Sequence, residues 1–178
     1  MNTNNKLWGA FTALDNYASI YEKYTRNIME KKGWDLIHYR KDKYYDLLLE
    51  KGDKKMKIEV KSCNKTFYTP NIFIECQSHG NDSFYRVTEA EYIFYYMPSL
   101  GKIWVFKTDD LKDAIERYHP KNNIIGEWSY RYGGDKQKSY GHLWKREAMI
   151  EAMGDKMIVL NDNNIKKMVN IGASKKLI

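Results

Sequence analysis

Cysteine, proline and long apolar runs are scarce in this sequence of 178 residues. The two cysteines, Cys63 and Cys76, fall on predicted core strands and lack the C-x-x-C spacing of a zinc site. Nothing therefore indicates a disulfide framework or a zinc centre, and buried thiols in a reducing compartment are expected. No apolar run approaches the roughly 18 residues of a membrane helix, and the first ten residues lack a signal-peptide pattern. These absences predict a cytoplasmic protein without membrane contact.

Linkers, repeats and low-complexity tracts are also missing. The three prolines, Pro70, Pro98 and Pro120, all lie in predicted connections. A chain of this length normally forms one domain with a real core. We therefore expect one domain over residues 1–178, with its core at about 13–119 and a C-terminal extension at about 120–178.

Charge is plentiful and mostly positive. The 30 Lys and Arg residues outnumber the 23 Asp and Glu residues and give a formal net charge of +7. A basic protein favours nucleic-acid binding, because neutralising phosphates releases counterions. The same charge also serves solubility alone, so both interpretations stay open here.

The most informative feature is an Asp followed thirteen residues later by a Glu-Val-Lys triplet. Asp46 and the Glu59–Lys61 triplet each lie in a short apolar run, and the Gly52-Asp53 dipeptide between them signals a hairpin. Alternation along the second strand should place Glu59 and Lys61 on one face and Val60 on the other. Two carboxylates and an ammonium are therefore expected to converge.

Such a group of side chains suits a hard cation. Mg²⁺ prefers oxygen ligands and usually binds one or two carboxylates together with waters and substrate phosphates. The lysine can orient a water molecule or neutralise charge that develops on a phosphate. The alternative is an edge strand with solvated charges, because charged residues are normally surface residues.

A third predicted strand, residues 71–77, extends this pattern. Ile72 and Ile74 share one face with Cys76, and Glu75 and Gln77 share the other. This arrangement would place the side chains of Glu75 and Gln77 beside the same cation.

These segments resemble the PD-(D/E)XK nuclease superfamily, which includes type II restriction enzymes, lambda-type exonucleases and archaeal Holliday-junction resolvases. The Asp-x12-Glu-x-Lys spacing fits that superfamily. Phage-borne members look similar in their third strand, which here reads NIFIECQSHG at residues 71–80, followed by TEAEY at 88–92. The likeness covers about 65 residues, from Tyr44 to Lys107.

The resemblance implies a Mg²⁺-dependent DNA endonuclease, with Mn²⁺ able to substitute, in a bacterial or phage-infected cell. Asp46 and Glu59 would ligate the metal together with the backbone carbonyl of Val60. Lys61 would position the attacking water, with assistance from Glu75. Members of the superfamily often dimerise to cut two strands, so a homodimer is a further expectation.

Accessory residues are less firmly indicated. Gln77 departs from the commoner phage pattern, which has an aromatic or acidic residue near this point, so its assisting role stays open. A first helix is predicted from about residue 13 to 32, and Gly33 ends it. The superfamily often takes an extra acidic group from this helix, which here would be Glu22. The alternative is a surface Glu that pairs with Lys23 or Arg26.

The remaining core elements follow from local signals. Residues 88–91 fit a capping box with Thr88 as N-cap, which predicts a short aromatic helix through Met97. A strand at 102–107 and an amphipathic helix at 109–118 complete an α/β fold of αβββαβ order. The resemblance identifies this order as a restriction-endonuclease-like core, with a central mixed sheet flanked by helices.

The last third of the chain is harder to interpret. Residues 132–141 have the glycine content of a mobile loop, in which Lys136, Lys138 and Ser139 are candidate DNA-backbone contacts. An ordinary hairpin loop is the alternative. Lys54 and Lys55, at the predicted hairpin turn, are further DNA-binding candidates. Residues 164–178 suggest a short helix followed by a frayed basic tail.

Two other functions compete with a nuclease. One is a catalytically silent DNA-binding protein of the same fold, although binding DNA without cleaving it does not require carboxylates that face phosphates. An interaction protein with a coincidental Glu-Val-Lys strand is the other. Binding of a divalent metal would separate the nuclease from both.

Overall fold

The computed structural model describes residues 20–40, 44–63, 69–118, 123–132 and 135–166, with backbone alone for the stretch from 123 to 139. The described chain runs in the order α1 (Ile20–Glu30), β1 (Asp35–Tyr39), β2 (Leu47–Lys51), β3 (Lys54–Ser62), β4 (Asn71–Ser78), β5 (Asn81–Asp82), α2 (Phe84–Val87), β6 (Tyr92–Met97), η4 (Pro98–Leu100), β7 (Lys102–Lys107), α3 (Thr108–Tyr118), β8 (Asn123–Tyr132), β9 (Asp135–Lys145), α4 (Arg146–Met153), η5 (Gly154–Lys156) and β10 (Met157–Asn161).

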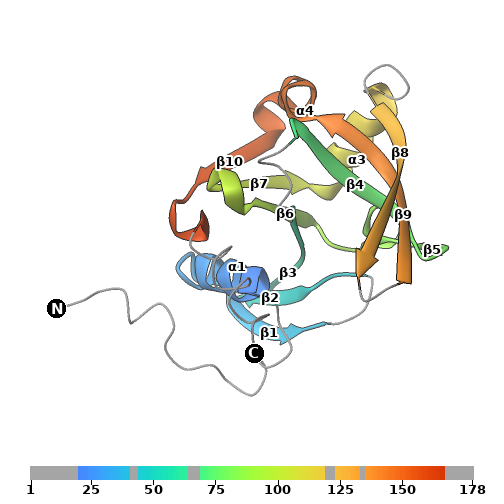
Figure 1. Cartoon of the computed structure of the whole chain (residues 1–178). Helices are drawn as coiled ribbons and strands as arrows, with labels where there is room; N and C mark the ends of the chain where they lie inside the picture. The colour runs from blue at the N-terminus through green and yellow to red at the C-terminus, as the bar shows by residue number, and fades with distance from the viewer. Residues whose placement is uncertain (1–19, 41–43, 64–68, 119–122, 133–134, 167–178) are drawn as a thin grey trace.

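A six-stranded sheet forms the centre of the molecule, in the order β1-β2-β3-β6-β7-β10 (Figure 1). Strand β3 runs parallel to β6, whereas the other neighbours in this sheet are antiparallel. A second sheet of four strands has the order β5-β4-β9-β8. The prediction of an α/β fold with a central mixed sheet and flanking helices is confirmed.

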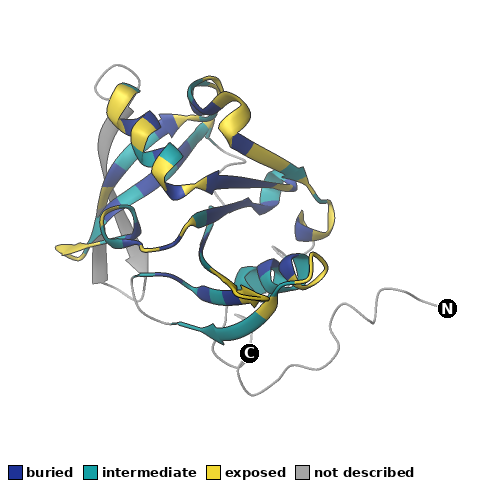
Figure 2. Ribbon diagram, turned by 180° about the vertical axis from the view of Figure 1, so that it is seen from behind, coloured by how far each residue is buried: buried dark blue, intermediate teal, exposed yellow. Residues whose placement is uncertain are grey.

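Two apolar clusters lie on the two faces of the central sheet. Helix α1 covers one face, where Met29 packs with Ile58 and Val60 of β3. The second sheet, α3 and α4 cover the other face, where Ile74 packs with Tyr95. Neighbouring residues of β6 and β7 enter different clusters, as strand alternation requires, and these two strands are buried throughout most of their length (Figure 2).

The β2–β3 hairpin forms as its sequence predicts. Gly52 and Asp53 make a two-residue turn, because Lys51 pairs directly with Lys54. The register then places Leu47 opposite Ile58, and both side chains are fully buried. A turn of this length fixes the register, so the position of Asp46 relative to Glu59 follows from local sequence.

Helix α1 ends at the glycine that the sequence indicates. Gly33 has a φ of 78°, and its N–H donates to the Glu30 carbonyl at 2.9 Å. The Trp34 N–H donates to the Met29 carbonyl at 3.1 Å, which completes a Schellman cap. The Thr25 side chain is fully buried, and its hydroxyl lies 2.7 Å from the Tyr96 hydroxyl. The part of the predicted helix before residue 20 lies outside the described residues.

The predicted helix at residues 88–97 is wrong. Tyr92–Met97 form β6, a central strand between β3 and β7. The aromatic and β-branched residues of this segment favour a doubly buried strand, and this tertiary burial outweighs the local capping signal. Thr88 instead accepts a hydrogen bond from the Ala90 N–H at 3.1 Å and donates to the Tyr44 carbonyl at 2.9 Å.

The third predicted strand exists but belongs to a different sheet. Strand β4 has the predicted alternation, with Ile72, Ile74 and Cys76 buried. It pairs with β5 and β9 in the second sheet and not with β3, the strand that carries Glu59. Sequence analysis also missed β1, which pairs with β2 at the edge of the central sheet. Neither a partner strand nor a sheet edge is encoded in a strand's own alternation.

Strand β7 and helix α3 match the predictions at 102–107 and 109–118 within a residue. Residues 135–141, predicted as a mobile loop, belong to β9, which pairs with β8 over ten residue pairs. The C-terminal part contributes to both sheets, because β9 pairs with β4 and β10 pairs with β7. A helical turn at 164–166 begins the predicted last helix. No helix that the structure describes has the length and apolar character needed to span a bilayer.

Candidate active site

Asp46 lies where strand β2 begins and its pairing with β3 ends. The Asp46 N–H donates to the Ile58 carbonyl at 2.9 Å, and the Val60 N–H donates to Asp46 Oδ2 at 2.6 Å. The side chain thus takes the place of the missing strand partner. The N–H and C=O of one strand residue point toward the same neighbour, so the Val60 carbonyl also faces the Asp46 side.

Glu59 and Lys61 lie next to each other on one face of β3, as predicted. Lys61 Nζ is 2.5 Å from Glu59 Oε1, and the Glu59 side chain is only 3% exposed. The Lys61 side chain is 33% exposed, so solvent reaches the pair at its ammonium group. Ile58 and Val60 point to the opposite face and pack in the cluster beneath α1. Asp46, Glu59 and Lys61 form what we call the carboxylate–lysine cluster.

The protonation equilibria show how closely these groups interact. The pKa of Asp46 is raised to about 7, mainly by burial and next by the Glu59 carboxylate, while Lys61 and the Val60 hydrogen bond oppose the rise. Desolvation lowers the pKa of Lys61, but the carboxylates of Glu59 and Asp46 more than offset this effect, and the pKa is raised overall. The ammonium is therefore held charged beside two carboxyl groups.

Two further predicted acids act on the cluster electrostatically. The charge of Glu22 on α1 contributes to the raised pKa of Asp46, and the charge of Glu75 on β4 contributes to the raised pKa of Lys61. Glu75 reaches this region from the second sheet, and its carboxylate accepts a hydrogen bond from the Ser83 hydroxyl. The structure thus brings Asp46, Glu59 and Lys61 together, whereas Glu22 and Glu75 act on them through their charges, and Glu75 does so from the second sheet.

A close backbone contact positions Glu75. Gly141 of β9 pairs with Glu75, and a bulge follows on β4 before Gln77. A Cβ at Gly141 would lie 2.2 Å from the Ile74 carbonyl oxygen, so only glycine allows this approach. Beyond the bulge, the Gln77 amide donates to Asp82 in the β4–β5 hairpin at 3.5 Å. The side chain of Gln77 is therefore engaged within its own hairpin.

The donor set fits a cation that needs few protein ligands. Among the described residues, no three His, Cys, Asp or Glu side chains are grouped closely enough to hold a metal ion by themselves. Two carboxylates and the Val60 carbonyl nevertheless match the usual demand of Mg²⁺, which takes its other ligands from water and phosphate. An ionised Asp46 also leaves the cluster with more negative than positive charge, which favours a cation.

Two of the predicted DNA-binding lysines lie away from the carboxylate–lysine cluster. The side chains of the other predicted DNA-binding residues are not among those that the structure describes. Lys54 and Lys55 are exposed beside the hairpin turn. Glu59 follows Lys54 by five residue steps along β3, which corresponds to about 17 Å. Lys136, Lys138 and Ser139 lie on β9, where their side chains are outside the described residues.

Two residues near the cluster were missed by sequence analysis. Phe84, at the start of α2, is 3% exposed, and its ring centroid lies 4.9 Å from Lys61 Nζ. Arg40, directly after β1, donates its N–H to the Asp46 carbonyl at 2.8 Å. The position of Arg40 could have been found from the segment DLIHY before it, whose apolar residues predict a strand that pairs with β2. Phe84 carried no comparable signal, because its contact joins distant segments.

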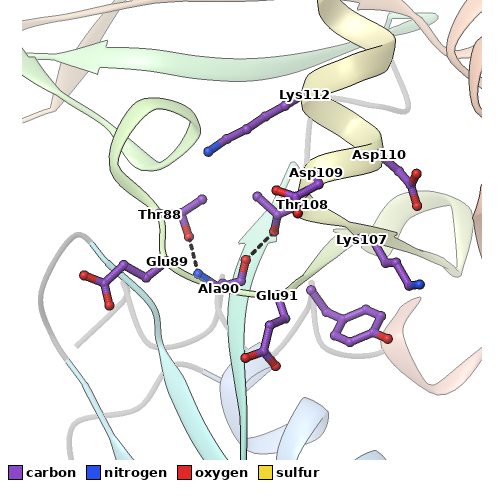
Figure 3. A pocket seen from close by; sticks show the side chains of 10 residues that line it. Thr88, Glu89, Ala90, Glu91, Lys107, Thr108, Asp109, Asp110 and Lys112 are labelled. Carbon is purple, nitrogen blue, oxygen red and sulfur yellow. Dashed lines mark hydrogen bonds between the residues drawn. The ribbon is translucent and has the colours of Figure 1, made fainter.

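A separate pocket of about 550 Å³ opens at the start of α3 (Figure 3). The hydroxyls of Thr88 and Thr108 point at the backbone of Ala90, which they hold from both sides. Charged side chains also line the pocket: Glu89, Glu91, Lys107, Asp109, Asp110 and Lys112. Acidic groups in a first helical turn stabilise the helix by themselves, and no residue of the carboxylate–lysine cluster lines this pocket.

Comparisons of the chain with protein-family models, with curated protein sequences and with solved structures gave no match. The functional argument therefore rests on the chemistry of the carboxylate–lysine cluster.

Proposed function

We propose that this protein is a Mg²⁺-dependent DNA nuclease of the PD-(D/E)XK type that hydrolyses phosphodiester bonds. The observation that carries the proposal is the convergence of Asp46 with the Glu59–Lys61 pair at the point where β2 and β3 separate. Placing a second carboxylate beside the almost fully buried Glu59 is costly unless the arrangement has a use. Phosphoryl chemistry with a divalent cation is such a use.

The path of the chain gives independent support. Helix α1, strands β1, β2 and β3, helix α2 and the parallel strand β6 follow one another in an αβββαβ order, with β4 and β5 inserted before α2. This assignment differs from the one that the sequence suggested, because β1 replaces β4 among the first three strands. It nevertheless places the Asp and the Glu-x-Lys residues on adjacent strands, as the resemblance requires.

Each residue has a role that its surroundings support. The carboxylates of Asp46 and Glu59 and the carbonyl of Val60 would hold the cation. When bound, Mg²⁺ supplies Lewis-acid polarisation of a phosphate oxygen and makes a water molecule more acidic. Lys61 is the partly exposed member of the cluster, so its ammonium can orient the attacking water and stabilise negative charge on the phosphate.

Asp46 must lose its proton before it can act as a ligand. Its pKa of about 7 implies that cation binding strengthens as the pH rises through neutrality, because the cation displaces that proton. Glu75 and Glu22 add negative charge around this site without belonging to the innermost pair.

The competing proposal is a DNA-binding protein that does not cleave. The net charge of +7 is compatible with either function. The cluster favours a nuclease, since carboxylates placed at the phosphate path repel DNA unless a cation lies between them. Substrate form, dimerisation and location in the cell stay predictions from the sequence.

The decisive experiment compares four DNA substrates: linear duplex, closed circle, single strand and four-way junction. Each is incubated with the protein in Mg²⁺, in Mn²⁺ and in EDTA. We expect metal-dependent cleavage of at least one substrate, and its loss by at least 100-fold in Asp46→Asn, Glu59→Gln and Lys61→Ala. The circular dichroism spectra of the variants should match that of the wild type.

The outcomes separate the alternatives. Binding without cleavage under all conditions would favour the silent DNA-binding protein. Wild-type turnover by any two of the three variants would remove the carboxylate–lysine cluster from the active site, even if cleavage itself depends on metal.

A further inference from the structure

Arg40 occupies a position next to the proposed active site that no predicted role accounts for. The backbone N–H of Arg40 donates to the backbone carbonyl of Asp46 at 2.8 Å. The two residues therefore lie opposite each other, directly after β1 and directly before β2. Directly opposed residues of antiparallel strands project on the same side, with Cα atoms about 5 Å apart. Arg40 thus starts from the face of the sheet that carries the carboxylate–lysine cluster.

Two tyrosine rings hold the guanidinium of Arg40. Its Cζ lies 4.8 Å from the centroid of the Tyr45 ring and 5.5 Å from that of Tyr44. Tyr45 is almost completely buried, so it forms a fixed support. Stacking uses the flat face of a guanidinium, whereas its N–H groups lie in the plane and suit the oxygens of a phosphate.

The surrounding charges show why such a group is needed. The charges of Glu59, Glu22 and Glu75 act on the Asp46–Lys61 region beside the single ammonium of Lys61, and this excess of negative charge repels a phosphate strand. A fixed positive charge beside Asp46 counters that repulsion.

We propose that Arg40, supported by Tyr44 and Tyr45, is a phosphate-binding subsite for the DNA strand that is cut. It holds a phosphodiester next to the one at the carboxylate–lysine cluster, and so it positions the strand without touching the reacting atoms. This inference rests on the proposed nuclease function for its substrate. Its evidence, however, is the ring-supported guanidinium at the strand end, which is independent of catalysis.

The test measures DNA binding without metal. Fluorescence anisotropy of a labelled single-stranded and a labelled duplex oligonucleotide is recorded in EDTA at several salt concentrations. We expect Arg40→Gln and Arg40→Ala to weaken binding at least tenfold at low salt and to reduce the salt slope by about one unit. Arg40→Lys should keep the slope but bind more weakly than wild type, because the ammonium lacks the planar fork.

The matched control is Arg26→Gln. Arg26 lies on α1, which covers the opposite face of the sheet, and its guanidinium pairs with Glu30. Its loss removes the same charge without touching the subsite, so affinity should stay within twofold of wild type. Equal losses in Arg40→Gln and Arg26→Gln would overturn the proposal, since they would indicate a general charge effect.

Folding and function are kept apart by two readouts. Arg40→Gln keeps the aliphatic part of the side chain and removes the guanidinium that lies over Tyr45, and its melting temperature shows whether the fold persists. A folded Arg40→Gln protein with unchanged affinity and salt slope would refute the subsite. Arg40-dependent binding by a wild-type protein that never cleaves DNA would keep the subsite and remove the nuclease. Cleavage by the wild type together with binding that does not depend on Arg40 would keep the nuclease and remove the subsite.

Discussion

At the scale of single residues, Asp46 links folding to the proposed chemistry. Its carboxyl group completes the hydrogen bonding of β3 by accepting from the Val60 N–H, yet burial and Glu59 disfavour its ionised form. The group is therefore stabilising when protonated and useful for cation binding when ionised. A ligand that carries such a conflict is typical of functional sites, where stability and activity make opposite demands.

The first prediction follows from the raised pKa of Asp46. The folded state binds this proton more tightly than the unfolded state, so its stabilising contribution is full below about pH 4 and is lost as the pH rises through about 7. In EDTA the free energy of unfolding should fall over this range by at most ~4 kcal/mol. Urea unfolding of wild type and Asp46→Asn from pH 4 to 8 measures this difference.

The amide of Asp46→Asn stays neutral at every pH and so resembles the protonated acid. We expect the variant to have a flatter pH profile and to exceed the wild type in stability at pH 8. Parallel profiles for the two proteins would show that another group controls the pH dependence.

The second prediction concerns Glu75, whose charge reaches Lys61 from the second sheet. Glu75→Gln should raise the Mg²⁺ concentration for half-maximal cleavage several-fold, because it removes negative charge near the cation without removing a ligand. Activity at saturating Mg²⁺ should stay near that of wild type. The control is Glu50→Gln, which removes an exposed carboxylate at the far end of β2. Coincident titrations for all three proteins would leave Glu75 without a role.

At the scale of elements, the short segment from β5 to α2 supports the site. Ser83 donates a hydrogen bond to the Glu75 carboxylate, and the neighbouring Phe84 places its ring 4.9 Å from Lys61 Nζ. Two consecutive residues thus contact two members of the site region. Because α2 has only four residues, its position depends on Phe84 entering the core beside Ile93 and Tyr95.

The third prediction tests whether Phe84 positions the Lys61 ammonium. Phe84→Leu keeps the apolar contact but removes the ring face, so kcat should fall about tenfold while KM changes by less than twofold. Phe84→Tyr keeps the ring and should restore most of kcat. If leucine and tyrosine reduce kcat equally, the ring acts through packing alone. Melting temperatures identify any loss that arises from unfolding.

At the scale of the whole molecule, charge and shape determine how a long substrate can lie. The hairpin turn with Lys54 and Lys55 is about 17 Å from Glu59 along β3, while Arg40 adjoins Asp46 directly. A strand held at Arg40 and at the carboxylate–lysine cluster must extend several nucleotides further to reach the turn. Contacts at the turn therefore depend on the length of the DNA.

The fourth prediction uses that separation. Replacing Lys54 and Lys55 with Ala should weaken binding of a duplex of about 20 base pairs and lower its salt slope by about one unit for each lost contact. Binding of a dinucleotide should not change, because two nucleotides are too short to span the distance. Equal effects on both DNAs would place the DNA path along the hairpin itself.

Local interactions explain why part of the fold was predictable. The strand at 102–107, the helix at 109–118 and the β2–β3 hairpin depend on periodicity and turn residues that lie close together in the chain. The segment Tyr92–Met97 shows the limit, since its capping signal predicted a helix. Burial between β3 and β7 favours a strand here, and the residues that create this environment are distant in the sequence.

The sequence by itself determined the hairpin and hence the approach of Asp46 to Glu59 and Lys61, because a two-residue turn fixes the register of adjacent strands. Only the tertiary structure decided that Glu75 comes from a second sheet, that Phe84 lies under Lys61 and that Arg40 borders Asp46. These contacts join segments that no local rule relates. Their positions follow from how the two sheets and their helices bury the two apolar clusters.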